Sequence, residues 1–238
     1  MIKFLLLFVL VLGVWANDDF EEFGEEFETQ EVYDPFSGYN RVMTNFNDSL
    51  YMNVLKPIDR GYKAITHVEV RRSIDKFFKN LYFPMRFLNN VLQLKITNAT
   101  EELSRFVINT TVGIGGLFDP AKSALDLEAH DEDFGQTLGY YGVGAGPHIV
   151  LPLWGPGNLR DVVSIFPNTA ISFVDYKERS WWTLTDTWAG FFGVKAAEQI
   201  NKYSLYSTEY EHIRADAVDL YPYLRDMYEQ KRKREIEE

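Results

Sequence analysis

The feature that most constrains the fold is a run of 26 residues, 134–159, that contains no formally charged side chain. A run of this length is long enough to cross a bilayer as a helix. However, seven of the chain's 16 glycines and three of its nine prolines lie within it. Glycine costs backbone entropy in a helix and proline removes a hydrogen-bond donor, so both oppose a continuous helix. A membrane-spanning helix is therefore not expected here.

An apolar segment that is not helical must still satisfy its backbone N–H and C=O groups. At membrane depth it does so only when packed on protein or lining a water-filled cavity. The sequence thus predicts a glycine-rich apolar hairpin within residues 133–161, closed by Arg160 and Asp161 and held in place by the other elements. An ordinary buried β-hairpin with turns at its glycines is the alternative, and composition alone favours it.

The N-terminus predicts a secretory signal peptide over residues 1–16. Lys3 supplies a positive start, Phe4 to Val14 form an apolar core, and Ala16 ends a small-x-small cleavage site. A retained anchor is the alternative, although a core of 11 residues is short for a span. The acidic residues 17–33 that follow predict a flexible tether, or a docking helix if their phenylalanines share one face.

Composition and charge exclude several classes of function. The formal net charge of −11 becomes −12 once Lys3, the single charged residue of the predicted signal peptide, is removed. A strongly acidic chain repels a phosphate backbone, so no nucleic-acid partner is expected. It also repels anionic lipid headgroups, so any membrane contact should be apolar and aromatic. The absence of cysteine excludes disulfides and thiolate metal sites.

Residues 34–230 predict a single, mainly α-helical domain, followed by a solvated charged tail at 231–238. A helix start is expected at Asp34 before Pro35, and a capping box at Asn98. Pro57 and Gly61 should interrupt or kink the first helix, and Pro167 should end a short helix that starts at Leu159. The expected apolar helix faces comprise Phe36, Tyr39, Met43, Phe46 and Leu50; Val70, Ile74, Phe77 and Leu81; Phe87, Leu88, Val91 and Leu92; Leu103, Phe106 and Val107; and, on a final helix over 208–230, Tyr210, Ile213, Ala217, Leu220, Leu224 and Met227.

Aromatic residues concentrate in residues 180–193, which include Trp181, Trp182 and Trp188. Tryptophan suits a membrane–water interface, because its ring is apolar and its N–H is polar. It also suits an ordinary protein core, and the sequence does not distinguish the two environments.

Motifs for catalysis and for cofactors were sought and not found. The four histidines show no metal-ligand spacing, and no nucleophile elbow or P-loop is present. The acidic run from His130 to Asp133 lacks the order of a calcium loop and fits a helix N-terminus better. We therefore expect no cofactor, no metal and no enzymatic activity, although a hidden carboxylate pair is not visible in a sequence.

Four ordered blocks between residues 34 and 161 resemble a known family. The first is Asp34-Pro35-Phe36-Ser37-Gly38-Tyr39-Asn40-Arg41, with Phe46-Asn47 after it. The second is Arg105-Phe106 with Asn109, continued by Gly113-Ile114-Gly115-Gly116-Leu117-Phe118-Asp119-Pro120-Ala121. The third is Glu132-Asp133-Phe134-Gly135-Gln136-Thr137-Leu138-Gly139. The last comprises Leu151-Pro152, Gly155-Pro156 and Arg160-Asp161. Together they resemble the MlaA (VacJ) family of outer-membrane phospholipid transport proteins.

The resemblance implies a ring of amphipathic helices embedded in the outer membrane on its periplasmic side, with a central glycine-rich hairpin beside a channel. It implies that phospholipids misplaced in the outer leaflet are removed and passed to a periplasmic lipid carrier, which maintains membrane asymmetry in a Gram-negative envelope. An outer-membrane porin trimer is the implied partner. Members of the family are typically lipoproteins with a cysteine after the signal peptide. This chain has none, so it is expected not to be a lipoprotein.

The hairpin is the candidate site for lipid passage. Its glycines are expected to let it flex or to let lipid approach the backbone, its apolar side chains to face lipid tails or the ring, and Arg160 to pin its base. The candidate residues are Gly139, Tyr140, Tyr141, Gly142, Val143, Gly144, Gly146, Ile149, Leu151, Arg160 and Asp161. Two alternatives are kept, a passive porin-associated envelope scaffold and a phospholipase.

Overall fold

The computed structural model describes residues 33–171 and 187–238. The predicted signal peptide, nearly all of the predicted tether, Trp181 and Trp182 lie outside the described residues. Where the chain is described, its regular elements are helices, and the β-structure consists of two isolated bridges. The elements are α2 Ser37–Leu50, the π-helical turn η2 Tyr51–Leu55, α3 Lys56–Ile65, α4 Val68–Leu81, α5 Phe83–Leu92, α6 Ile96–Thr111, α7 Pro120–Leu125, α8 Phe134–Tyr140, α9 Leu159–Ile171, α10 Trp188–Asp216 and α11 Leu220–Glu237.

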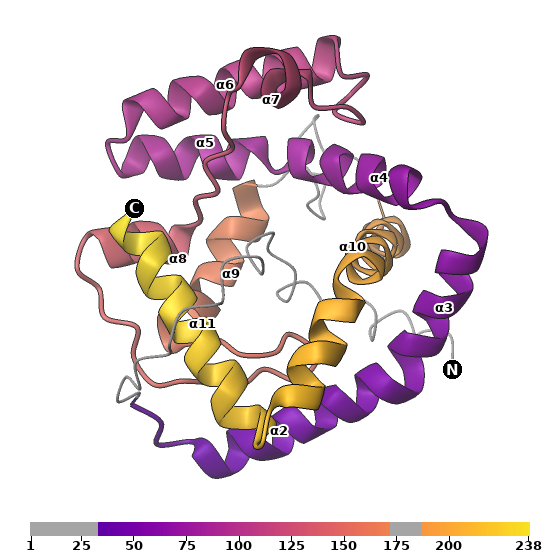
Figure 1. Cartoon of the computed structure of the whole chain (residues 1–238). Helices are drawn as coiled ribbons and strands as arrows, with labels where there is room; N and C mark the ends of the chain where they lie inside the picture. Colours follow the sequence, from indigo (N-terminus) through magenta and orange to yellow (C-terminus); the bar gives the residue numbers. More distant parts are fainter. Residues whose placement is uncertain (1–32, 172–186) are drawn as a thin grey trace.

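These helices form a ring, which confirms the predicted mainly α-helical architecture. Figure 1 shows α2, α3, α4, α5, α8 and α11 around a ring, with α6 and α7 stacked outside α5 and with α9 and α10 inside. α5 packs on α6, α10 packs on α3 and α4, and α11 packs on α2 and α8. None of the described helices is both long and apolar enough to cross a membrane.

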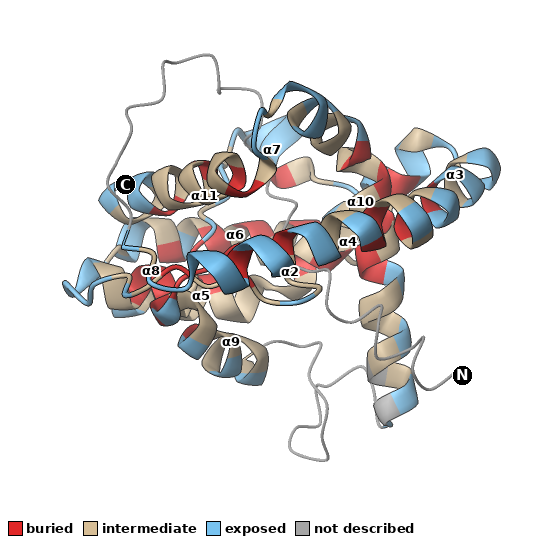
Figure 2. Cartoon of the chain, turned by 90° about the horizontal axis from the view of Figure 1, so that it is seen from below, coloured by how far each residue is buried: buried red, intermediate tan, exposed pale blue. Residues whose placement is uncertain are grey.

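Several ring helices bury their polar side chains and expose their apolar ones. Among the described residues, more polar than apolar residues are buried. On α2, Asn40 and Thr44 are buried whereas Tyr39 and Phe46 are exposed, and Figure 2 shows the outward face of this helix as largely exposed. The same inversion holds for the polar residues Arg71, Arg86, Asn89, Asn90, Glu102, Arg105 and Asn109, which are buried, and for the apolar residues Val70, Leu92, Leu103 and Val107, which are exposed. Part of the predicted apolar faces thus lies on the outside of the ring, whereas Leu50, Leu224 and Met227 of those faces are buried.

Two buried arginines of the ring, Arg86 and Arg105, are paired with carboxylates. Arg86 donates from Nε to Glu102 Oε2 at 2.7 Å, and Glu102 is fully buried. Arg105 donates to Asp119 at 2.8 Å, and Asn109 donates to the same carboxylate. Removing one partner of a buried ion pair lowers the free energy of unfolding by about 3–5 kcal/mol, because the other charge is left buried and uncompensated. These contacts therefore fix α5, α6 and the start of α7 relative to one another.

The first helix does not start at Asp34 as predicted. α2 begins at Ser37, and the Asp34 carboxylate instead accepts hydrogen bonds from Asn40 at 2.9 Å and from the Tyr221 hydroxyl. Arg225 lies 3.4 Å from the same carboxylate. The Asp34 carboxylate therefore joins the start of α2 to α11 and does not serve as a local backbone cap.

The predicted capping box at Asn98 is also wrong. α6 begins at Ile96, so Asn98 already lies in the first turn of the helix. Glu101, the expected partner of the cap, lies 2.7 Å from the His130 ring instead. The long-range partner prevails because it ties the loop before α8 to α6, which a local cap does not do.

The predicted interruption near Pro57 takes the form of a π-helical turn. η2 lies between α2 and α3 and ends at Leu55, two residues before Pro57, which occupies the first turn of α3. A wider turn is a common way to accommodate a proline within a helical path, because the proline N–H that would continue the bonding pattern is missing. Gly61, the second predicted breaker, lies within α3 without interrupting it.

Pro167 does not end its helix, so this prediction is wrong. α9 continues through it to Ile171. The missing proline N–H leaves the carbonyl of Val163 without its usual donor. Val163 is exposed. A carbonyl at such a position can be satisfied from outside the helix, which lowers the cost of the proline.

The predicted final helix over 208–230 is two helices. The chain breaks after Asp216, where Ala217 is extended, and α11 restarts with Asp219 as its N-cap, which accepts from Tyr221 N. The predicted solvated tail at 231–238 is wrong as well, because α11 continues to Glu237 and Arg232 is buried. The sequence of a basic run does not show which of its residues faces the protein interior.

Candidate functional site

The charge-free segment forms a short hairpin between α8 and α9. Antiparallel bridges join His148 to Asn158 and Leu151 to Gly155. Ile149 N donates to the carbonyl oxygen of Gly157 at 2.8 Å. The predicted hairpin is thus present over residues 148–158. Its candidate residues Gly139 and Tyr140 belong to α8 instead, because Asp133 caps that helix by accepting from Gln136 N.

Two asparagines on α2 bind the backbone of the hairpin. Asn40 accepts from Val150 N at 2.8 Å and donates to the His148 carbonyl oxygen at 3.0 Å. Asn47 donates to the Leu151 carbonyl oxygen at 3.0 Å and accepts from the next residue but one, Leu153, at 2.6 Å. Each side-chain amide therefore satisfies one donor and one acceptor of the hairpin, as a neighbouring strand would. The seven-residue spacing of the two asparagines places both on one helix face. This spacing is the sequence signal for the pair, and it is not among the features predicted from the sequence.

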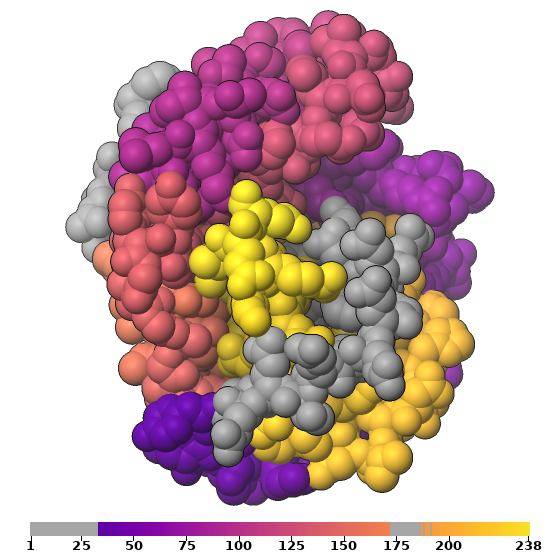
Figure 3. Space-filling view, turned by 60° about the vertical axis from the view of Figure 1, so that its left-hand side comes forward, coloured from indigo at the N-terminus to yellow at the C-terminus, as the bar shows by residue number. Residues whose placement is uncertain are grey.

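The C-terminal helix α11 binds the other side of the hairpin. Figure 3 shows α11, in yellow, lying against the salmon-coloured segment that contains α8 and the hairpin. His148 is fully buried, and its Nδ1 lies 2.7 Å from Glu229 Oε1. Asn158 donates to the other oxygen of Glu229 at 3.5 Å. One carboxylate of α11 thus contacts both members of a hairpin bridge.

The base of the hairpin is held by Arg232, which contacts two carboxylates. Its guanidinium donates to Asp161 at 2.7 Å and 3.0 Å and to Asp133 at two distances of 3.0 Å. Tyr228 donates to Asp161 as well. Burial alone would raise the pKa of Asp133, but the charge and hydrogen bonds of Arg232 lower that pKa below its usual range. We call Arg232, Asp133 and Asp161 the clamp; it joins α11 to the starts of α8 and α9.

Arg160 lies where the sequence predicts, at the closing end of the hairpin. Its Nη1 donates to the Val143 carbonyl oxygen at 3.0 Å, and its Nε lies 3.6 Å from Asp161. The stronger partner of Asp161 is Arg232, which the sequence did not reveal. Arg160 therefore fixes the segment before the hairpin, while Asp161 belongs to the clamp.

The remaining candidate residues form an exposed apolar edge next to the hairpin. Tyr140, Tyr141 and Val143 are all exposed. Gly142 and Gly144 are exposed too, and among the described residues no atom lies within 4 Å of a Cβ built at either one. Gly142 has a φ of +83°, so its glycine is required by the turn. Two further candidates, Ile149 and Leu151, lie in the hairpin itself, and Gly146 lies two residues before it with a φ of +73°.

The acidic residues before α8 are structural. Glu132 accepts from Gln93 and from Lys95, both at 2.6 Å, and Asp133 caps α8. Within the described ranges no group of histidine and acidic side chains is arranged to hold a metal ion. The interpretation of this run as a helix N-terminal cluster agrees with these contacts.

Charged residues between α4 and α10 lie in a poorly solvated environment. Asp75 and Lys79 form an ion pair at 3.3 Å, and the Asp75 side chain is 13% exposed. Burial raises the pKa of Asp75 to about 6, and burial lowers the pKa of Lys79 to about 8. Both shifts favour the neutral forms, as expected where desolvation outweighs pairing.

Asp75 should therefore make stability fall as pH rises. Its folded pKa of about 6 lies above the unfolded value of 3.8, so the folded state binds the proton more tightly. The resulting stabilisation is complete below pH 3.8 and is lost as pH rises through 6. We expect wild type to lose about 1–3 kcal/mol relative to Asp75→Asn across that window, because one pKa unit corresponds to 1.36 kcal/mol. Urea unfolding at several pH values measures this difference. The exposed control Asp216→Asn should track wild type, and parallel curves for Asp75→Asn and wild type would contradict the assignment.

The fold and the site together define an α-helical ring protein with an apolar outer surface and a tethered hairpin. The MlaA lipoprotein family model matches residues 32–235, so the chain belongs to the MlaA family.

Known relatives agree with this assignment. An uncharacterized protein of Rickettsia typhi is 42% identical over 147 residues, which are 61% of this chain and 58% of that protein. The Escherichia coli (strain K12) protein named "Intermembrane phospholipid transport system lipoprotein MlaA" is 36% identical over 131 residues, 54% of this chain and 52% of that protein. This chain thus matches less than two thirds of the length of either relative. A solved chain described as "Structural basis for maintenance of bacterial outer membrane lipid asymmetry" superposes with a TM-score of 0.72 at 30% identity, covering 85% of this chain and 98% of its own.

Proposed function

We propose that this chain is the outer-membrane component of a phospholipid transport system. It removes phospholipids misplaced in the outer leaflet and passes them to a periplasmic lipid carrier, which maintains lipid asymmetry. Membership in the MlaA family, the name of the Escherichia coli relative and the description of the similar solved chain support this proposal. An outer-membrane porin trimer is the proposed membrane partner.

The observation that carries the proposal is the inverted polarity of the ring. Apolar side chains such as Phe46, Val70 and Leu103 are exposed, while polar ones on the same helices are buried. Exposed apolar patches of this extent mark interaction surfaces, and a lipid leaflet satisfies such a surface without specific partners. We propose that this surface holds the ring on the periplasmic side of the outer membrane, which suits a chain whose 238 residues include no cysteine.

A lipid path through such a ring requires a polar strip for the headgroup beside an apolar strip for the tails. We place the apolar strip along the exposed edge at Tyr140, Tyr141 and Val143 and along the hairpin at Ile149 and Leu151. The clamp and the α2 asparagines fix the hairpin, and Arg160 holds the Val143 carbonyl oxygen. We propose that the edge adjusts at Gly142 and Gly144, where an added Cβ meets no described atom within 4 Å. Moving a lipid breaks no covalent bond, so the proposal requires no catalytic group.

The proposal is tested by the surface phospholipid of intact cells that lack this gene. A membrane-impermeant amine reagent labels phosphatidylethanolamine in the outer leaflet. Labelling should rise in the deletion strain and return to normal when the wild-type chain is restored, without lyso-lipid appearing. Unchanged labelling would overturn the transport function and favour an envelope scaffold. Release of lyso-lipid by the purified chain would indicate a phospholipase instead.

Gly144→Val should impair transport without unfolding the chain. The glycine is not required by its φ, and an added Cβ meets no described atom within 4 Å, so only the freedom of the segment is lost. We expect surface phospholipid to approach the level of the deletion strain. Gly142→Val should do the same with a stability loss of about 1–2 kcal/mol, because a branched residue is strained at positive φ. The control is Gly38→Val, because Gly38 is an open position in α2. Normal surface lipid in both the Gly142 and the Gly144 variant would contradict a role for this segment.

A further inference from the structure

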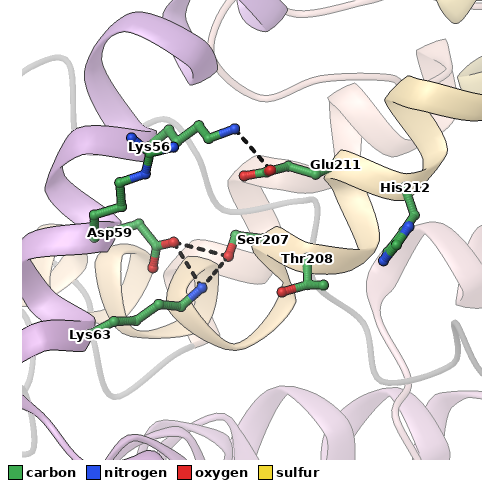
Figure 4. Close-up of a pocket in the computed structure, with 8 residues that line it drawn as sticks. Lys56, Asp59, Lys63, Ser207, Thr208, Glu211 and His212 are labelled. Carbon is green, nitrogen blue, oxygen red and sulfur yellow. Dashed lines mark hydrogen bonds and ion pairs between the residues drawn. The ribbon is translucent and has the colours of Figure 1, made fainter.

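A pocket of about 450 Å³ lies between α3 and α10, away from the hairpin. That volume is within the ~300–1,000 Å³ range of sites for small molecules. Its lining is polar and charged: Lys56, Asp59, Arg60, Lys63, Ser207, Thr208, Glu211 and His212. Figure 4 shows Lys56, Asp59 and Lys63 of α3 facing Ser207 and Glu211 of α10. Nothing in the lipid path described above uses these residues.

The pocket holds charges that the fold itself does not fully satisfy. Lys56 pairs with Glu211 at 2.8 Å, and Lys63 pairs with Asp59 at 2.9 Å. The Arg60 guanidinium has no ion-pair partner among the described residues, although it lines the same pocket. The site thus offers a cation with open donors, and a guanidinium is well suited to bind a phosphate through two parallel hydrogen bonds.

Asp59 supplies the complementary feature. This residue is 5% exposed, and its Oδ2 accepts from Ser207 at 3.0 Å and from Lys63. Its other oxygen, Oδ1, has no hydrogen-bond partner in the described part of the chain. A buried carboxylate oxygen without a donor is costly, so it points to a missing group that carries N–H or O–H.

We propose that the pocket between α3 and α10 binds the headgroup of a zwitterionic phospholipid that carries a primary amine. Arg60 and Lys56 bind the phosphate, with the Thr208 hydroxyl beside them. The ammonium donates to Oδ1 of Asp59. The lining has three basic and two acidic side chains, so it suits a ligand that carries both a positive and a negative charge. The inference deepens the proposed function, on which it rests, by assigning a headgroup preference to lipid transport.

The chemistry distinguishes this ligand from related ones. A quaternary choline has no N–H, so it cannot fill the open acceptor of Asp59. A glycerol headgroup lacks the cation, and inorganic phosphate lacks the amine. Loss of one charge-assisted hydrogen bond corresponds to about a tenfold loss of affinity. Phosphoethanolamine should therefore bind about tenfold more tightly than phosphocholine or glycerol phosphate, at the same phosphate charge.

The test is a titration of the full chain in detergent with these soluble headgroups and with inorganic phosphate, followed by NMR or calorimetry. Arg60→Gln should weaken every phosphate ligand by about tenfold, and Asp59→Asn should abolish the preference for the primary amine while phosphate still binds. Arg72→Gln, an exposed arginine of α4, is the matched control. Equal binding of phosphoethanolamine and phosphocholine, or unchanged binding by Arg60→Gln, would overturn the inference. Inorganic phosphate binding as tightly as phosphoethanolamine would overturn it too, because the site would then serve free phosphate.

Measuring two surface lipids in cells separates this inference from the proposed function. Cells that carry Asp59→Asn should accumulate surface phosphatidylethanolamine while phosphatidylglycerol, which has no amine, is still cleared. If both lipids are cleared normally, the headgroup site is wrong and transport stands. If the wild-type chain restores neither lipid in the deletion strain, transport is wrong, and the titration alone decides whether the pocket binds a headgroup.

Discussion

Replacement of Arg232 by glutamine should lower the free energy of unfolding by about 3–5 kcal/mol, the cost of breaking a buried ion pair from one side. The substitution leaves Asp133 and Asp161 close together without their cation, and both carboxylates are mostly buried. Because these residues cap α8 and begin α9, the hairpin base should loosen with them. Denaturant unfolding measures the stability loss, and hydrogen exchange at Ile149 N reports the hairpin.

Two variants make that result specific. Lys233→Gln removes a positive charge from the exposed neighbour on the same helix and should change stability by less than about 0.5 kcal/mol. Arg232→Lys keeps the charge but loses the planar fork that contacts both carboxylates, so it should fall between wild type and Arg232→Gln. Equal stability of Arg232→Gln and Lys233→Gln would show that the clamp contributes nothing.

Asn40→Ala should cost about 2–4 kcal/mol and release the His148–Val150 part of the hairpin from α2. Asn40 is fully buried, and its amide contacts the Val150 N–H and the His148 carbonyl group. Its removal leaves both backbone groups unsatisfied in a buried position, at about 1–3 kcal/mol each before relaxation. Amide exchange at Val150 should accelerate, and surface phospholipid should rise in cells.

The matched control for this prediction is Asn45→Ala. Asn45 lies on the exposed side of the same helix, so its replacement should leave both stability and exchange close to wild type. A hairpin that stays equally protected in Asn40→Ala would show that Asn47 and α11 hold it without Asn40. The prediction of a coupled transport defect would then fail as well.

Helix positions were largely predictable from the sequence, because apolar residues recur at helical spacing. Proline and glycine were weaker guides, since Pro84 lies at the start of α5 but Pro167 and Gly61 lie inside helices. The direction of those faces was not. Periodicity reports that Tyr39 and Phe46 share a side of α2, but it does not report whether water, lipid or protein covers that side. The structure places Asn40 and Thr44 inward instead. Amphipathic patterns thus define a helix equally well when its polar face is the buried one.

The hairpin was predictable because a long charge-free segment rich in glycine excludes most other structures. Its anchors were not, since Asn40, Glu229 and Arg232 are distant from it in sequence. Arg232 lies in a run of basic residues that is typical of a solvated end. It differs from its neighbours only because α11 continues through the run and directs this side chain inward. The sequence likewise predicts Asp34 to be a local helix cap, because its partners Tyr221 and Arg225 are distant in sequence.

The polar packing of the ring also determines how its stability responds to temperature. The heat capacity change of unfolding increases with newly exposed apolar area and decreases with newly exposed polar area. This ring already exposes many apolar side chains when folded, and it buries many polar ones. Calorimetry should therefore give a heat capacity change below the usual ~12–15 cal/mol/K per residue. The stability curve is then shallow, so cooling or warming the cell changes the population of the folded ring very little.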